Sequence, residues 1–153
     1  MAQTEALNPR REPDARDRYR HFVSITTRLM DNDIYNHVNN ATYFSFIDTA
    51  VTSYLARAVN RDLAGDAIVY FVVESGCAYF RPIAFPDAVH CGLRVTAIGT
   101  SSMRFEVGLF RNAEPLAAAQ GFFVQVTCDR ATQRPVAMPA PVRAALEALQ
   151  VAG

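Results

Sequence analysis

The spacing of hydrophobic residues predicts a strand where the patterned part of the chain begins. Within residues 21–29, one face carries Val23, Ile25, Thr27 and Leu29, and the other carries Ser24, Thr26 and Arg28. This alternation is typical of a strand that buries one face.

The spacing changes to that of a helix at Tyr43. Hydrophobic residues then recur three or four positions apart, at Tyr43, Phe46, Ile47, Ala50, Val51, Tyr54, Leu55 and Ala58. The opposite face is small and uncharged, and Asp48 is its only ionisable residue before Arg57. A surface helix normally presents charged residues to water, so we expect a sheet to enclose this helix on most sides.

The chain from there to Cys128 has strand-like patterns interrupted by Gly, Pro and Asn. Residues 68–79 are rich in Val, Phe and Tyr, and Ser75-Gly76 indicates a bulge or kink. Alternating segments at 89–97 and 103–109 predict a hairpin.

A turn at 112–115 leads into a long last strand, residues 118–128. Pro139 and Pro141 then open a short helix with four inward residues, Val142, Ala145, Leu146 and Leu149. Because short connections join antiparallel neighbours, we expect an α+β fold with one antiparallel sheet and one dominant helix.

Length and charge narrow the class of protein. The 153 residues suit one domain, and residues 1–18 lack an apolar period, so we expect a disordered tail and a domain over 19–153. A formal net charge of zero argues against a nucleic-acid partner. We see no secretory signal and no membrane-length apolar run, and therefore expect a cytoplasmic protein with no membrane partner. The three cysteines, Cys77, Cys91 and Cys128, are expected to be buried reduced thiols.

Polar and ionisable side chains are concentrated in residues 28–43, between the first strand and the helix. A loop on a rigid scaffold is a common place for function. The helix begins just beyond Asn40, and its unpaired N–H groups and positive dipole end suit an oxyanion near Asp33.

This segment resembles the hotdog-fold acyl-CoA thioesterases of the 4-hydroxybenzoyl-CoA thioesterase type. The similarity rests on the D-x-D-x-x-x-H-V-N-N-x-x-Y run from Asp31 to Tyr43. Supporting agreements are the segment Tyr79-Phe80-Arg81-Pro82, Asp87, the turn at 99–102 and Pro139.

The resemblance implies an antiparallel sheet wrapped around the central helix, subunits paired into dimers or homotetramers, and active sites at the subunit interface. Asp33, the second Asp of D-x-D, would be the catalytic carboxylate, as nucleophile or as general base on water. Backbone N–H groups of Asn40, Ala41 and Thr42 would polarise the thioester carbonyl. The family uses no metal and no organic cofactor, and no pair of the histidines has a metal-ligand spacing.

Two positions depart from related patterns. Plant acyl-carrier-protein thioesterases of this fold have an Asn two residues after the Asp and a His four after it, whereas this chain has Tyr35 and His37. Other hotdog branches place a carboxylate on the central helix, where Asp48 lies. We favour Asp48 as an interior polar group bonded to a Ser, Thr or Arg.

Each candidate in this segment also has a structural interpretation. Asp33 could bond its own backbone in an Asx turn, and Asn39 and Asn40 are favoured helix caps. His37 is either a proton relay or a turn residue that bonds a carbonyl. Tyr43 has the spacing of a core residue, although its hydroxyl could reach the acyl pocket.

Candidates for substrate binding lie on the strands as well. The arginines that could meet CoA phosphates, or could simply be solvated, are Arg81, Arg94, Arg104 and Arg111. We select Arg81, Ser102 and Tyr43 as substrate-binding residues. Ser102 most simply belongs to a turn, and no G-x-S-x-G motif supports a serine nucleophile.

We therefore expect hydrolysis of an acyl-CoA thioester to a free acid and CoA. Two other classes remain open: a hotdog hydratase or dehydratase acting on enoyl or 3-hydroxyacyl thioesters through Asp33 and His37, and a non-catalytic acyl-CoA binding protein. Aryl, short and medium acyl groups, carried by CoA or by acyl-carrier protein, all fit the pattern.

Overall fold

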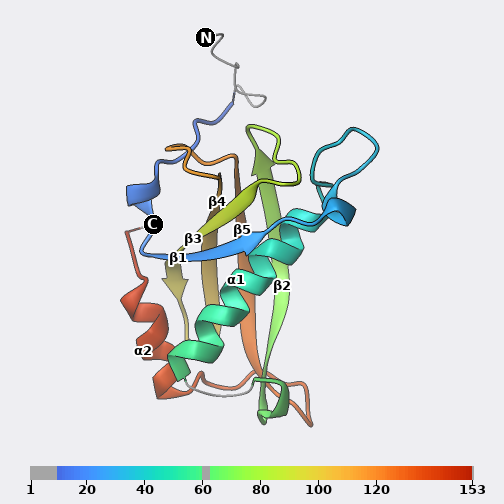
Figure 1. Ribbon diagram of the computed structural model, residues 1–153. Coiled ribbons are helices and arrows are strands. Elements are labelled where there is room, and N and C mark those ends of the chain that lie inside the picture. The colour runs from blue at the N-terminus through green and yellow to red at the C-terminus, as the bar shows by residue number, and fades with distance from the viewer. Residues whose placement is uncertain (1–9, 60–62, 153) are drawn as a thin grey trace.

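The computed structural model describes residues 10–59 and 63–152. They form one antiparallel sheet with a long helix across one face and a short helix beside it (Figure 1). The elements are η1 (Arg16–Arg18), β1 (His21–Thr26), η2 (Leu29–Asp31), α1 (Thr42–Val59), η3 (Leu63–Gly65), β2 (Ile68–Tyr79), β3 (Ala88–Ile98), β4 (Ser102–Arg111), β5 (Ala119–Asp129) and α2 (Ala140–Ala148). The predicted α+β class, with a sheet around one central helix as in the hotdog fold, is confirmed.

The strand order is β1-β3-β4-β5-β2, so β1 and β2 are the edges of the sheet. The predicted hairpin of β3 and β4 is confirmed, and its register runs from Val89 opposite Arg111 to Ile98 opposite Met103. β2 pairs with β5 rather than with β3, which follows it in the chain. One long side of β2 therefore has no strand beside it in the single chain.

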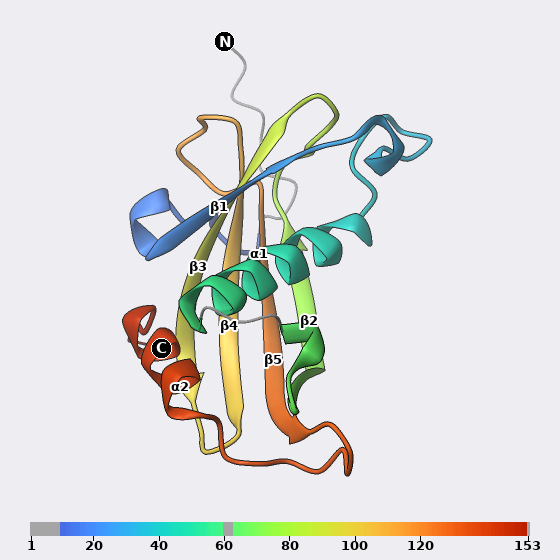
Figure 2. The same cartoon turned by 60° about the horizontal axis from the view of Figure 1, so that its bottom comes forward.

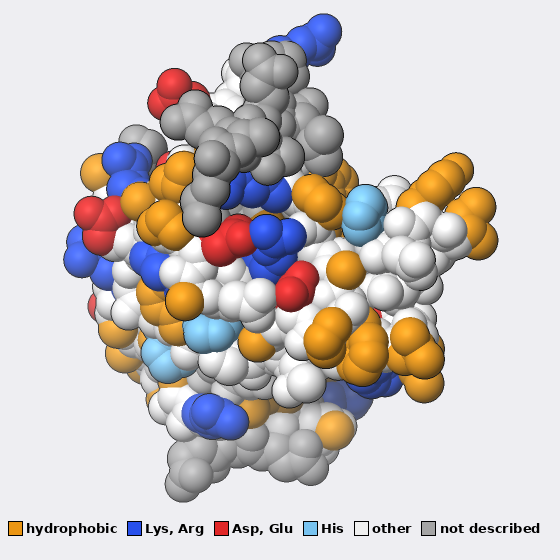
Figure 3. All heavy atoms as spheres, turned by 45° about the horizontal axis from the view of Figure 1, so that its top comes forward, with side chains coloured by type: hydrophobic (Ala, Val, Ile, Leu, Met, Phe, Trp, Pro, Cys, Tyr) orange, Lys and Arg blue, Asp and Glu red, His pale blue; other side chains and the backbone are white. Residues whose placement is uncertain are grey.

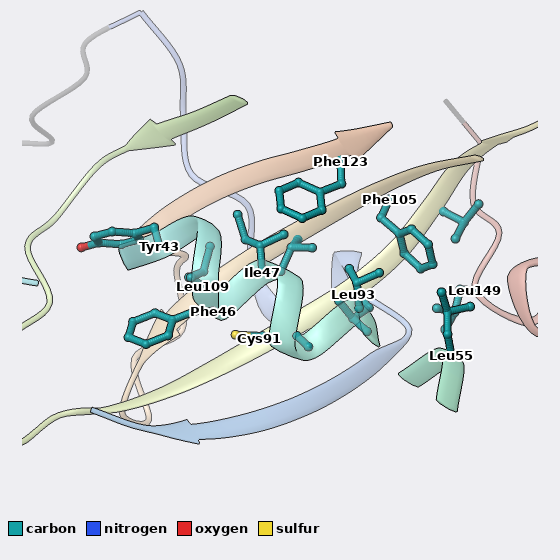
Figure 4. Packing of buried hydrophobic residues seen from close by; sticks show 14 of the residues in the cluster. Tyr43, Phe46, Ile47, Leu55, Cys91, Leu93, Phe105, Leu109, Phe123 and Leu149 are labelled. Atoms are coloured by element: carbon teal, nitrogen blue, oxygen red, sulfur yellow. The ribbon is translucent and has the colours of Figure 1, made fainter. Parts of the chain in front are cut away.

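Helix α1 runs obliquely over the sheet (Figure 2). Its residues Ile47, Ala50 and Val51 are fully buried. Gly121 on β5 permits this close approach, since a Cβ there would collide with the Ile47 side chain. Figure 4 shows these side chains packed against those of β3, β4 and β5. Each large apolar side chain buried in this way contributes about 1.5–3 kcal/mol.

The other face of α1 is open to solvent, so the expectation that the helix is enclosed on most sides is wrong for the single chain. Ser45, Asp48, Thr49 and Thr52 are all exposed. Asp48 is therefore a surface group in the chain and not the interior polar group that we favoured. One sheet covers only the face that it contacts, and small polar side chains lose little by meeting water.

Two local expectations also fail. The first strand ends at Thr26, and Leu29 is 72% exposed because the chain turns there into η2. The irregularity in β2 lies between Val72 and Glu74 and not at Ser75-Gly76. Gly76 instead leaves room for an aromatic ring, since a Cβ there would lie 2.6 Å from Cε1 of Phe122.

The outer face of the sheet carries the segment that precedes β1. The Asp14 N–H donates to Oε1 of Gln120 at 2.6 Å, and Arg94 forms ion pairs with Asp14 at 2.9 Å and with Glu106 at 2.7 Å. Tyr19 is buried in the same region. Of the expected tail, residues 1–9 lie outside the described residues.

The C-terminal helix is confirmed, with Val142, Ala145, Leu146 and Leu149 buried. The Tyr54 hydroxyl ties α1 to α2 by donating to the Ala145 carbonyl oxygen at 2.7 Å. Cys91 and Cys128 are buried free thiols, as expected, whereas Cys77 is half-buried. None of the helices in the described ranges has the length and apolar character needed to cross a membrane.

Candidate functional site

A tight loop, residues 32–38, lies between η2 and α1. Asn32 and Val38 form an isolated antiparallel bridge, and inside it the Asp33 N–H donates to the His37 carbonyl oxygen at 2.8 Å. Asn36 completes the turn with a φ of 59°, in the left-handed region that Asn tolerates better than most residues. The backbone of the loop itself therefore fixes where the Asp33 side chain begins.

The segment that follows β2 holds this loop in place. The Val38 N–H donates to the Ile83 carbonyl oxygen at 2.7 Å. Oδ1 of Asn32 accepts from the Phe85 N–H at 3.0 Å. The loop is thereby placed beside the end of the open edge strand, as the view in Figure 1 also shows.

The Asp33 carboxylate is half-buried and only partly engaged. Its Oδ1 accepts a hydrogen bond of 2.8 Å from the Tyr35 N–H, which is the Asx turn of the structural interpretation. Within the described part of the chain, Oδ2 of Asp33 accepts no hydrogen bond. The structure thus shows a locally anchored carboxylate that keeps one oxygen for other chemistry.

Asp31, the first carboxylate of D-x-D, has a different environment. It is only 3% exposed, and it accepts from the Arg28 N–H at 2.7 Å and from the Arg28 guanidinium at 3.1 Å. These bonds close η2. Asp31 is therefore a structural carboxylate, and the two acids of the motif have separate tasks.

The start of α1 offers one free amide. Oδ1 of Asn39 accepts from the Ala41 N–H at 2.9 Å, so the expected cap is confirmed for Asn39, and the Thr42 N–H donates to the Asn39 carbonyl oxygen, also at 2.9 Å. The N–H of Asn40 donates to no acceptor among the described residues. Of the three amides expected to polarise a carbonyl, only that of Asn40 is available in the single chain.

Tyr43 is a core residue at the base of this site, with 3% of its surface exposed. Burial raises the pKa of Tyr43 to about 12, a hydrogen bond from the Ile83 N–H opposes the rise, and the charge of Asp33 adds a smaller contribution to it. The structure therefore brings Asp33 and Tyr43 into electrostatic contact and keeps the Tyr43 phenol neutral.

His37 lies in the turn with its side chain exposed, and its carbonyl oxygen makes the bond to Asp33. Arg81 follows β2 directly and is half-buried, and its guanidinium has no carboxylate partner among the described residues. The other candidate arginines are already paired, Arg94 and Arg104 with Glu106 and Arg111 with Glu114. Arg81 is therefore the one of the four without a counter-ion.

Ser102 is not near Asp33 within one chain. It begins β4 at the end of the sheet where β3 and β4 turn, whereas the Asp33 loop follows Thr26, which pairs with Ala88 at the other end of β3. β3 spans Ala88–Ile98, and a strand of that length extends roughly 35 Å.

Large hydrophobic side chains are exposed on and beside the loop. They include Leu29 and Met30 in η2 and Ile34 and Tyr35 in the turn, and Figure 3 shows such side chains on the projection at its right. Phe71, Val72 and Val73 form a second exposed set on β2. Contiguous apolar surface of this kind is typical of a protein interface.

A metal site has no visible basis here: across residues 10–59 and 63–152, no three His, Cys, Asp or Glu side chains gather as a ligand set.

Tyr79 is the residue that sequence reasoning did not single out. Its hydroxyl donates to the Asn40 carbonyl oxygen at 2.9 Å. The sequence placed Tyr79 only within the segment that matches the hotdog thioesterases. A tyrosine at the end of an edge strand was the available signal, but its partner is decided by tertiary packing.

Comparison with known proteins points in one direction. The family model described as the Thioesterase-like superfamily matches residues 27–146. YsmA of Bacillus subtilis strain 168, described as an uncharacterized protein, is 23% identical over 107 residues, which cover 69% of this chain and 72% of YsmA.

Two solved structures are similar over most of the chain. The PA5185 protein from Pseudomonas aeruginosa strain PAO1 is 46% identical with a TM-score of 0.89, and the match covers 94% of this chain and 100% of that one. A thioesterase from Thermus thermophilus, solved with coenzyme A and Zn, is 32% identical with a TM-score of 0.72, covering 86% and 94%. Since the family model takes in the D-x-D run, α1 and all strands from β2 to β5, this chain belongs to the thioesterase-like superfamily.

Proposed function

We propose that this protein hydrolyses acyl-CoA thioesters, with Asp33 as the catalytic carboxylate and the Asn40 N–H as the donor to the thioester carbonyl. The observation that carries the proposal is the pairing of an open carboxylate oxygen with an unbonded backbone amide on one short segment. Hydrolysis needs a base or nucleophile and a donor for the developing oxyanion, and these two groups are of those kinds.

The reaction follows from these two groups. Asp33 accepts a proton from water as the water oxygen bonds to the carbonyl carbon, and the Asn40 N–H stabilises the negative charge on the carbonyl oxygen. The carbon–sulfur bond then breaks, its electron pair leaves on the CoA sulfur, and the proton passes from Asp33 to that sulfur. If Asp33 attacks the carbonyl carbon directly, water hydrolyses the resulting acyl anhydride in a second step.

Coenzyme A is the carrier that we propose. The Thermus thermophilus thioesterase, at 32% identity, was solved with coenzyme A. Arg81 lies at the end of β2 without a carboxylate partner in the described part of the chain, which suits a phosphate of the carrier. Tyr43 would form part of the floor beneath the acyl group.

The proposed active unit is a dimer formed through β2. This edge exposes Phe71, Val72 and Val73, and an unpaired apolar edge strand is a template for a second strand. Antiparallel pairing of two β2 strands would place the far end of one sheet beside the Asp33 loop of the other. Ser102 of the partner subunit would then approach the site, and the apolar side chains of the loop would be covered. A homotetramer would be two such dimers.

The test is release of free thiol from a panel of aryl, short-chain and medium-chain acyl-CoA thioesters. We expect steady turnover of at least one class by the wild type and by Asp17→Asn, which changes an exposed carboxylate on η1, and almost none by Asp33→Asn. Loss of enoyl absorbance without thiol release would indicate a hydratase instead. Tight binding of acyl-CoA with no turnover of any thioester would indicate a binding protein.

A further inference from the structure

Tyr79 ends β2 and points toward the start of α1. Its ring meets the ring of Tyr43 edge-on, with centroids 4.9 Å apart and an interplanar angle of 89°. Its hydroxyl donates to the Asn40 carbonyl oxygen at 2.9 Å. A side chain of the sheet therefore holds the backbone from which the helix starts.

The held peptide is next to the free amide. The Asn40 carbonyl belongs to the peptide bond between Asn40 and Ala41, and the N–H of this same peptide is fixed by Oδ1 of Asn39 at 2.9 Å. The preceding N–H, that of Asn39, donates to the Asp31 carbonyl oxygen at 2.9 Å. The direction of the Asn40 N–H is thus set by peptides that are anchored on both sides.

These anchors differ in origin. The bonds of Asn39 are local and would form in any helix start of this sequence. The bond from Tyr79 comes from another part of the fold, and it alone fixes the turn relative to β2. Burial and the neighbouring Cys77 raise the pKa of Tyr79, so its hydroxyl remains a donor across the range in which enzymes work.

A tyrosine bonded to a carbonyl can also be a simple tether. Tyr54 provides the comparison, because its hydroxyl makes the same kind of bond at 2.7 Å, to Ala145, near the other end of α1. The Tyr54 bond joins two helices and touches no group that we assign to chemistry. What distinguishes Tyr79 is the peptide that it holds.

We propose that Tyr79 is a positioning residue, whose hydroxyl fixes the Asn40–Ala41 peptide and thereby aims the Asn40 N–H at the thioester carbonyl. This inference rests on the proposed function. It assigns to β2 a part in the reaction in addition to its place at the sheet edge.

The experiment compares Tyr79→Phe with the matched control Tyr54→Phe. Each change removes one hydroxyl and keeps the ring, so both variants should fold, and circular dichroism and melting temperature check this. Complete removal of an oxyanion donor lowers kcat about 100- to 1,000-fold, and a misdirected donor should lower it about tenfold. We therefore expect Tyr79→Phe to lose about tenfold in kcat with KM unchanged, and Tyr54→Phe to keep the kcat of the wild type.

Amide hydrogen exchange provides a second readout that needs no turnover. We expect faster exchange over residues 38–44 in Tyr79→Phe and unchanged exchange there in Tyr54→Phe. Equal kcat for Tyr79→Phe and wild type, equal losses in both variants, or unchanged exchange at the helix start would each overturn the inference. If the wild type hydrolyses no thioester, the proposed function fails, and the exchange comparison alone decides whether Tyr79 fixes the turn.

Discussion

The Asp33 N–H and the His37 carbonyl oxygen lie 2.8 Å apart, and this bond closes the turn that carries the proposed catalytic carboxylate. His37 therefore acts on Asp33 through its backbone in this structure, while its imidazole faces solvent. The shape of the turn, more than the identity of the histidine side chain, sets the position of Asp33.

Asn36 is the residue on which this turn depends. Its φ of 59° is unfavourable for a β-branched side chain, so Asn36→Val should lower the free energy of unfolding by about 1–2 kcal/mol and reduce kcat/KM by displacing Asp33. Asn36→Gly, which accepts this φ, should keep both. Urea unfolding and thiol-release kinetics measure the two effects. Wild-type values for Asn36→Val would show that the turn does not need the left-handed conformation.

Gly108 on β4 should be intolerant of any side chain. A Cβ there would lie 2.5 Å from Cζ of Tyr19, whose ring is held by Phe110 at 5.7 Å and by the Arg94 guanidinium at 4.7 Å. We expect Gly108→Ala to lower the free energy of unfolding by about 1–3 kcal/mol. Gly65→Ala is the control, because nothing lies within 4 Å of its Cβ position. Equal stability of the two variants in urea would contradict this packing.

Tyr43 should make the fold sensitive to alkali. Burial raises its pKa from 10.0 to about 12, so the phenol is neutral in both states below pH 10, and its contribution to stability is complete there. Between pH 10 and 12 the unfolded state ionises first, and stability falls by about 2–3 kcal/mol. Urea unfolding from pH 9 to 12 should show a shallower decline for Tyr43→Phe. Parallel curves for the variant and the wild type would contradict the assignment.

The edge of β2 can be tested with a charge. Val73 is 61% exposed, and a lysine there would oppose strand pairing. Val73→Lys should shift the protein from dimer to monomer in sedimentation velocity and lower thioester hydrolysis in parallel. Ser24→Lys, at an exposed position on the opposite edge strand β1, should change neither property. A fully active monomer would exclude an interface site.

The elements were predictable because each carries a clear period. The helical spacing from Tyr43 and the alternation of β3 and β4 both reappear in the structure. The strand order was not predictable, since β2 carries no signal that selects β5 over β3 as its neighbour. The small polar face of α1 was misread because the same residues suit a covered interface and a bare surface.

The site was predictable where it is local in sequence. Asp33, Asn39 and Asn40 lie in one run, and the cap made by Asn39 follows from residue preference. Two features depend on tertiary packing: which amide stays free at the helix start, and which side chain of the sheet reaches it. The bond from Tyr79 to Asn40 joins residues on different elements, and no local pattern encodes it.

The central claim is tested most directly by kcat/KM for the best acyl-CoA substrate, measured for wild type, Asp33→Asn and Asp17→Asn under identical conditions. The account predicts a loss of at least about 100-fold for Asp33→Asn with the fold intact, as expected when a general base or nucleophile is removed, and no loss for Asp17→Asn. Turnover by Asp33→Asn equal to that of the wild type would contradict it.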